Sequence, residues 1–433
     1  MSKKNLEKIL ISFPPLIIFA ITFFSSDIDK SSFYGITTYT EYSWNDITIL
    51  PLYPYFLKAI FVIFGDLNWH AVLIFQLVMC LITFFFLRKI ILLLDLKFNI
   101  FVILSLMMSL NIYYRFNIFL PNGMYIFLFV LMIYNFLSYN RKLKFKNFIK
   151  GCILISLLIL TRPISFIFVI FVSPFFFIYL CKIKNLKLFI RLRNIFVFFA
   201  LILIGFGLQS FKYYSNTGKI GYVDQTSGHI ALFTVPCLAQ KFACGKANAI
   251  YKQKIIDELK IIKKEKLKIT KQDYYEIAKK YFLTIDKNII FFSVIFGYLK
   301  LMLHSPLLEI FQYYNLNIIS FSDFKNENFL IQLYNFGENI YLEKHMFIWL
   351  FSQILIVIER FVQIFGIIYL LKKKPYLTIL LILICISLAG PSIGIGNPRY
   401  RSEIEPILII FFSSGVFYLE NLRKRFKFFR LLS

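Results

Sequence analysis

The sequence predicts an all-α, polytopic integral membrane protein with about ten transmembrane helices, and three observations indicate this fold class. Of the 433 residues, 59% are hydrophobic and only 17% are charged, so there is too little polar surface to cover a soluble globule. Apolar runs of roughly 20 residues, long enough to cross a bilayer, recur along the chain. The 49 basic residues, against 23 acidic ones, gather in short clusters between these runs, which argues against a nucleic-acid partner.

Each expected span is an apolar run bounded by charged or turn-forming residues. The first, residues 9–24, follows a lysine-rich start in the manner of a signal peptide. Pro14-Pro15 interrupts the run and no small-residue cleavage site follows, so we expect an uncleaved helix. The other expected spans are 71–87, 90–112, 117–137, 149–161, 164–181, 194–209, 346–371, 376–389 and 404–420.

The loops between these spans alternate in charge. With ten spans, the strongly basic loops and ends fall on one side: residues 3–8, 88–89, 141–150, 182–193, 372–374 and 423–430. The positive-inside rule makes that side cytoplasmic, with both termini inside and with anionic membrane lipids as partners. The first loop on the other side, residues 25–70, has five acidic and two basic residues. We expect a multi-pass protein of the bacterial inner membrane.

These spans divide the chain into three parts. Residues 1–209 form an N-terminal membrane module, 210–345 a large external insertion, and 346–433 a C-terminal membrane module. Within the insertion, residues 289–311 are apolar, but a crossing there would place the basic cluster 372–374 outside. We therefore expect an interfacial helix with Lys300 and His304 toward water.

Two cysteines, Cys237 and Cys244, lie close together in the insertion. An oxidising external compartment favours a disulfide between them, and the alternative is a pair of unpaired thiols. The four histidines are scattered and no His/Cys spacing resembles a zinc site, so no metal ligands are assigned.

Arginine occurs at four external span ends, on the side that should be poor in basic residues: Arg115, Arg162, Arg399 and Arg401. Its planar, bidentate donors suit phosphate. We interpret Arg115 as reaching toward lipid headgroups. The other three would suit a negatively charged, lipid-linked group at the outer interface.

Acidic residues stand opposite these arginines. Asp27 and Asp29 follow the first span with almost no spacer, and a carboxylate held there can act as a general base toward an acceptor hydroxyl. Their spacing would also suit a divalent cation, and the plainer alternative is a pair of solvated loop acids. Glu359-Arg360 falls within the eighth span, where we expect a structural polar contact.

Short motifs follow one another in a defined order. They are an acid after the first span, Pro51-Leu52-Tyr53-Pro54-Tyr55-Phe56 leading to Phe64-Gly65, Gln76, Leu160-Thr161-Arg162-Pro163, Thr217-Gly218 and Asn397-Pro398-Arg399-Tyr400-Arg401 through Pro406. In this order and sidedness the chain resembles the C superfamily of glycosyltransferases. It is most similar to bacterial protein O-mannosyltransferases and to the aminoarabinose transferase that modifies lipid A.

The resemblance implies a polyprenyl-phosphate-linked sugar as donor, and inverting transfer to a glycan, lipid or protein acceptor at the outer face. It places the catalytic base at the first-loop acid that lies four residues before an aromatic. Asp29 fits through Phe33, with Asp27 as the second candidate. The Arg399-Tyr400-Arg401 element, with Arg162, would hold the donor phosphate.

Two departures leave the donor sugar open. Many relatives carry two adjacent acids where this chain has Asp29-Lys30, and often Ser-Glu where it has Pro121-Asn122-Gly123. Two other functions remain as alternatives. An O-antigen-polymerase-like protein would share the spans, the large external loop and the external arginines. A non-enzymatic lipid or sugar transporter would carry charges through the middle of the bilayer, where only Glu359-Arg360 lies.

Overall fold

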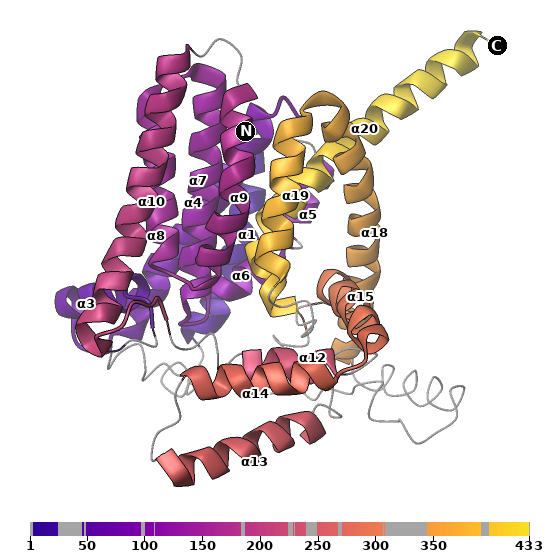
Figure 1. Cartoon of the computed structure of the whole chain (residues 1–433). Coiled ribbons are helices and arrows are strands. Elements are labelled where there is room, and N and C mark those ends of the chain that lie inside the picture. Colours follow the sequence, from indigo (N-terminus) through magenta and orange to yellow (C-terminus); the bar gives the residue numbers. More distant parts are fainter. Residues whose placement is uncertain are drawn as a thin grey trace, which may run out of the picture.

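The computed structural model of the protein describes most of the chain, and every regular element in that part is a helix (Figure 1). The described residues are 3–24, 46, 49–96, 100–107, 109–182, 187–223, 228, 230–239, 249–266, 271–305, 307, 344–390 and 398–432. Several of these helices are long and apolar enough to cross a bilayer, so the prediction of an all-α membrane protein is confirmed.

Five helices in the described ranges have the length and hydropathy of a membrane span. They are α4 (Trp69–Leu93), α7 (Pro121–Lys142), α10 (Leu188–Thr217), α18 (Lys344–Lys373) and α20 (Glu405–Leu432). A sixth would result if α14 (Lys271–Thr284) and α15 (Lys287–Leu303), bent by 106° at their junction, formed one span. Shorter apolar stretches occur in α1 (Lys3–Phe24), α3 (Leu52–Phe64), α9 (Ile164–Lys182) and α19 (Pro375–Ala389). The count of ten spans stays a prediction.

The helices form two groups that stand side by side in Figure 1. In the first group α4 packs on α1 and α7, and α8 (Phe145–Ile159) packs on α7 and α10. In the second group α18 packs along α20. The two groups meet where α19 packs against α9. The large buried core is formed by residues of both helix groups.

Glycines allow α18 and α20 to approach very closely. A Cβ atom added to Gly366 would lie 1.8 Å from the carbonyl oxygen of Phe411. One added to Gly415 would lie 2.0 Å from the carbonyl oxygen of Val362. Small residues are the usual means by which helices in membranes bring their backbones together, so this contact has the character of a membrane helix pair.

The expected span 90–112 is wrong as a single helix. Helix α4 continues through Arg88 and Lys89 to Leu93, and the chain then turns into two short helices, α5 (Ile100–Met107) and α6 (Leu110–Phe116). The two basic residues had indicated a loop. A helix can carry them because long side chains extend beyond the apolar zone, and the Lys89 ammonium lies 4.2 Å from the centre of the Phe85 ring.

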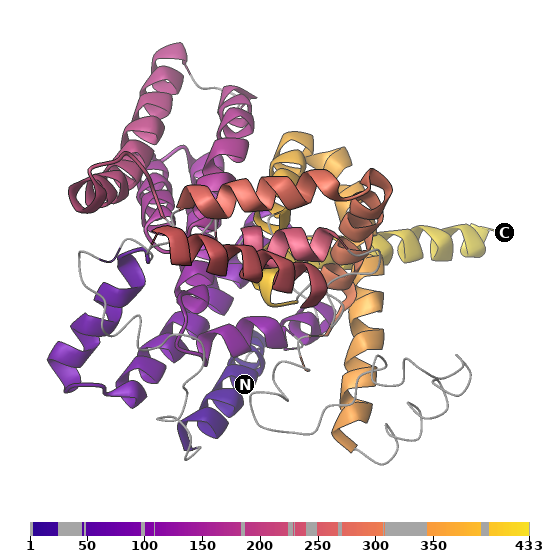
Figure 2. The ribbon, with the colours of Figure 1, turned by 60° about the horizontal axis from the view of Figure 1, so that its bottom comes forward.

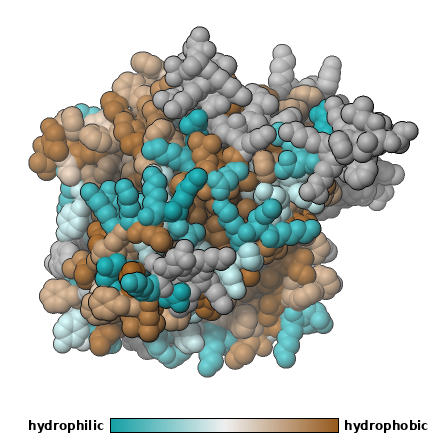
Figure 3. Space-filling view, turned by 90° about the horizontal axis from the view of Figure 1, so that it is seen from above, coloured by the Kyte–Doolittle hydropathy of each residue, from teal (hydrophilic) through white to brown (hydrophobic). Residues whose placement is uncertain are grey.

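The ends of α4, α7 and α18 lie close together. Asp95, just after α4, lies 3.4 Å from Arg141 at the end of α7 and 3.7 Å from Lys374 between α18 and α19. Two basic clusters expected on the cytoplasmic side, 141–150 and 372–374, therefore meet at one end of the molecule, beside Asp95, which was expected inside the span 90–112. Seen from that end, hydrophilic side chains form a band between hydrophobic flanks (Figure 3), and the α7–α8 turn contributes exposed basic residues there.

The described part of the insertion lies across the opposite end (Figures 1 and 2). It contains a π-helical turn η1 (Ile230–Thr234), α12 (Val235–Leu238), α13 (Ala249–Lys266), α14 and α15. Its small core includes Ile255 and Leu259 of α13 and Ile277 of α14. The expectation that His304, just after α15, faces water is wrong. Its ring is half-buried, 6.4 Å from that of Trp349 in α18, with Nδ1 hydrogen-bonded to the amide of Gln353 (3.0 Å).

Candidate functional site

A buried carboxylate joins three elements at the end of the molecule that carries the insertion. Glu403 closes the 3-10 helix η5 (Pro398–Glu403), and its carboxylate is ion-paired with Arg162 in the turn between α8 and α9. The same carboxylate accepts a hydrogen bond from Asn122 Nδ2 at the start of α7 (3.2 Å). The Glu403 side chain is 1% exposed and that of Arg162 is 16% exposed. Arg162 therefore lies at the edge of the cluster.

Arg401, two residues earlier in η5, is fully enclosed. Its Nε donates to Glu405 Oε1 (2.5 Å), and its Nη1 donates to the carbonyl oxygens of Leu301, Met302 and His304 (3.1, 2.8 and 2.9 Å). These carbonyls belong to the C-terminal end of α15, where a helix lacks its own donors and favours a positive charge. Arg401 thus fastens the insertion to the membrane helices.

Arg360 in the middle of α18 completes this network. It lies 3.6 Å from the same Glu405 oxygen, its Nε donates to the Met302 carbonyl (3.0 Å), and its Nη1 donates to Gln363 (2.8 Å). The structural polar contact expected for Glu359-Arg360 is therefore present at Arg360. Buried ion pairs of this kind fix geometry, because removing one partner leaves an uncompensated charge.

The neutral imidazole of His304 belongs to the same end of α15. Burial lowers the pKa of His304 to about 4, and the positive charges of Lys300 and Arg401 act in the same direction. The ring is therefore uncharged at neutral pH, and this end of α15 gains no further positive charge.

The segment that leads into α3, within the loop expected over residues 25–70, is attached beside the Arg162 turn. The backbone N–H of Leu52 donates to the Leu160 carbonyl (3.1 Å), and the Lys212 ammonium of α10 donates to the Ile49 carbonyl (2.9 Å). Two of the landmark residues also touch, since Gln76 Nε2 donates to the Tyr53 hydroxyl (3.2 Å). The start of α3 therefore shares one end of the molecule with Arg162.

The predicted site residues divide into three groups. Arg162 is ion-paired with Glu403 and Arg401 with Glu405, and these two glutamates are two residues apart in the chain. Arg399 and Tyr400 lie in the backbone of η5, but their side chains are outside the described part. Asp27 and Asp29 lie outside the described residues altogether.

Two further predictions concern residues away from this cluster. Arg115 is 2% exposed and lies 4.8 Å from the centre of the Tyr114 ring, so its expected reach to lipid headgroups is wrong. Cys237 is in a disulfide, and Cys244 lies outside the described residues, so the pairing of the two stays a prediction. Among the described side chains, no three His, Cys, Asp or Glu residues are grouped to hold a metal ion.

Four functional candidates were missed from the sequence: Asn122, Lys212, Glu403 and Glu405. One of them carried a local signal, since Arg401 and Glu405 are four residues apart at a helix start, a spacing that favours pairing. The others form contacts with residues far away in the sequence, which no local pattern indicates.

Comparisons of the chain with protein-family models, with curated proteins and with solved structures find no match. The fold by itself defines the class, that of an all-α membrane protein. To this class the described residues add a buried network of arginines and glutamates at one end of the helices.

Proposed function

We propose that the protein is an inverting membrane glycosyltransferase that uses a polyprenyl-phosphate-linked sugar at the outer face of the bacterial inner membrane. One observation carries the proposal: three segments far apart in the sequence converge at one end of the molecule. They are the start of α3 at Leu52 within the acidic first loop, the turn at Arg162, and η5 with its two arginines. A transferase of this kind needs a base and a phosphate site in one place.

The arginines then have different roles. Arg162 is more exposed than Arg401 and would contact the donor phosphate. Its ion pair with Glu403 would then be replaced in part by hydrogen bonds to the phosphate. Arg399 and Tyr400 would contribute from η5. Arg401 already donates four hydrogen bonds, one to Glu405 and three to carbonyl oxygens at the end of α15. It would therefore act mainly by holding η5 against α15.

Asp29 would act as the general base. It would take the proton of the acceptor hydroxyl or amine as that group attacks the anomeric carbon from the face opposite the phosphate. The bond from the anomeric carbon to the phosphate oxygen would break, and the electron pair would leave with the polyprenyl phosphate. Arg162 and Arg399 would stabilise the charge that develops there. The configuration of the sugar is therefore inverted.

Loss of the base is the direct test. In membranes supplied with a radiolabelled polyprenyl-phosphate sugar and an acceptor extract, Asp29→Asn should lower transfer by about 10²–10⁴-fold at equal expression. Asp27→Asn is the matched control, and we expect it to retain most of the activity. Full transfer by normally expressed Asp29→Asn would eliminate Asp29 as the base, and a loss with Asp27→Asn alone would move the role to that residue. Repeating the assay with a chelator tests the divalent cation.

The same assay separates the alternatives. A polymerase would form a ladder of lengthening products, whereas a single-sugar transferase forms one. A transporter would move labelled lipid across the membrane and form no product. Transport is the less favoured reading, because Arg360, the basic member of the charged pair inside a span, is bound to Glu405, Gln363 and the end of α15.

A further inference from the structure

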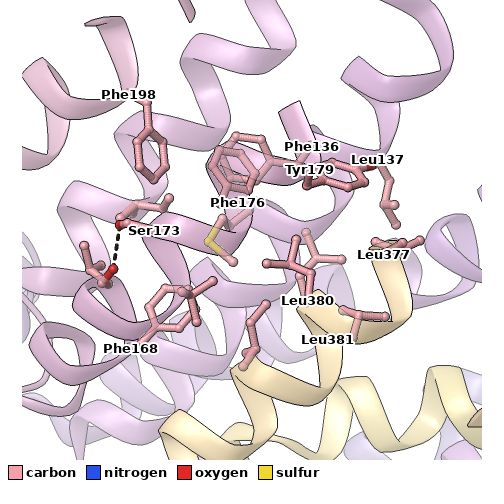
Figure 4. A pocket seen from close by; sticks show the side chains of 16 residues that line it. Phe136, Leu137, Phe168, Ser173, Phe176, Tyr179, Phe198, Leu377, Leu380 and Leu381 are labelled. Carbon is pink, nitrogen blue, oxygen red and sulfur yellow. Dashed lines mark hydrogen bonds between the residues drawn. The ribbon is translucent and has the colours of Figure 1, made fainter. Parts of the chain in front are cut away.

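An apolar cavity lies inside the helical assembly, between α7, α8, α9 and α10 on one side and α19 on the other (Figure 4). Aromatic rings form much of its wall: Phe136, Phe168, Phe176, Tyr179 and Phe198. The cavity therefore lies at the contact between the two helix groups.

The wall offers almost no hydrogen bonds. The Ser173 hydroxyl already donates to the Val169 carbonyl (2.5 Å), the bond drawn in Figure 4. Tyr179 is the one other residue of the wall with a hydroxyl group, and the remaining side chains are aliphatic, phenyl or, at Met132, a thioether. A buried water requires two to four polar partners, roughly, and apolar cavities of this kind stay dry and accept apolar molecules. The chemistry of the wall thus selects a hydrocarbon.

The cavity lies at the depth of lipid chains. Helix α9 begins at Ile164, just after Arg162, and its wall residues extend from Phe168 to Tyr179. At about 1.5 Å per helical residue, these positions lie roughly 9 and 26 Å from Arg162 along the axis. This interval falls within the ~30 Å hydrocarbon core of a bilayer. A lipid whose headgroup sits near Arg162 would carry its chain toward the cavity.

We infer that this cavity binds the hydrocarbon chain of a membrane lipid. Two lipids supply the same chemistry. One is the polyprenyl phosphate of the donor, and that assignment rests on the proposed function. The other is a phospholipid, whose acyl chain would occupy the cavity whatever reaction the protein performs.

Photolabelling of the whole protein tests the inference. The protein is reconstituted into vesicles of phosphatidylethanolamine and phosphatidylglycerol with one of three diazirine probes. The first is a polyprenyl phosphate labelled at the far end of its chain, the second the same lipid labelled beside the phosphate, and the third a phosphatidylglycerol labelled at the end of an acyl chain. Peptide mapping after illumination then locates the adducts. We expect a chain-end probe to label 164–182 and 375–389.

Adjacent residues supply matched variants. Val169 lines the cavity, whereas Ile170, one residue further on, is 52% exposed on the outside of α9. Val169→Phe should lower chain-end labelling about tenfold, which corresponds to ~1.4 kcal/mol of binding free energy, and Ile170→Phe should not. Leu380→Phe in the cavity and Ile379→Phe outside it form a second pair on α19, in case one variant folds poorly.

The outcomes separate the two lipids from each other and from the function. Labelling of these helices by one chain-end probe alone identifies that lipid as the occupant. No labelling there by either chain-end probe, or labelling that both cavity-filling variants leave unchanged, overturns the inference. The phosphate-end probe reports separately on the donor site: adducts near Arg162 without chain-end adducts in the cavity would retain the proposed function and reject the cavity.

Discussion

Two helix contacts in this protein, α18–α20 and α9–α19, join apolar surfaces with opposite results. In the first, Gly366 and Gly415 let two backbones touch, and Glu405 ties α20 to Arg360 of α18. In the second, α9 and α19 pack against each other beside an apolar cavity lined by large side chains. Close packing without voids makes a contact rigid, whereas a void leaves room for a ligand. The first contact is therefore suited to hold η5 in place and the second to admit a chain.

The largest expected effect comes from the charge that supports the tight contact. Glu405→Gln leaves the buried Arg401 and Arg360 without their shared carboxylate and should destabilise the protein by ~3–5 kcal/mol. Thermal or denaturant unfolding of the purified protein in micelles measures this.

Asp95 provides a matched control for that variant. It also lies between two basic residues from different helices, Arg141 and Lys374, but its side chain is 69% exposed. Asp95→Asn should cost at most ~1 kcal/mol, because exposed ion pairs contribute little. Equal losses in the two variants would show that burial does not distinguish these networks.

A single added carbon atom compares the two contacts directly. Gly366→Ala places a Cβ against the Phe411 carbonyl and should destabilise the protein by ~1–3 kcal/mol through overpacking. Val172→Ile adds one carbon to the wall of the cavity and should change stability by less than ~1 kcal/mol. Unfolding in micelles again measures both.

The control for the glycine substitution is Gly207→Ala in α10, where an added Cβ meets nothing within 4 Å. It should be neutral or stabilising by up to ~1 kcal/mol, because alanine is the better helix former. If Gly366→Ala is as stable as Gly207→Ala, the close approach of α18 and α20 does not limit stability.

Much of the fold could be predicted from the sequence because span ends carry local signals. Pro163 marks the predicted start of α9 at residue 164, and Pro375 marks the predicted start of α19 at residue 376. Both predicted starts agree with the structure to within one residue. The break between α5 and α6 was missed, because an uninterrupted apolar run resembles one helix whether or not it is straight.

The site was harder to predict than the fold. The arginines could be selected because they violate a charge rule, but Glu403, the partner of Arg162, carries no local signal. Arg162 and Glu403 meet only through the folding of segments far apart in the sequence, and a single sequence holds no record of that contact. The cavity could not be predicted from the sequence either, because the residues that line it are of the same types as those of the filled core around it.

The smallest expected effect lies in the insertion, where an ion pair outside the membrane helices can be titrated. The Glu258 carboxylate of α13 accepts hydrogen bonds from Lys280 and Tyr281 of α14, both at 2.7 Å. Burial raises its pKa, but these two hydrogen bonds and the Lys280 charge outweigh burial and hold the pKa below its ordinary value.

A carboxyl group with a lowered folded-state pKa stabilises the fold above its unfolded pKa, and this stabilisation is lost as the pH falls through the folded value. Glu258→Gln should therefore weaken the α13–α14 contact by less than ~1 kcal/mol at neutral pH. The difference from wild type should vanish below about pH 4. Hydrogen exchange of the α13 amides across this pH range measures the difference in stability between the variant and wild type. A difference that persists at low pH would show that packing rather than charge holds α13 against α14. Glu258, with a side chain 29% exposed, and Asp95, at 69%, then both contrast with Glu405, at 9%, because a carboxylate contributes less where water reaches it.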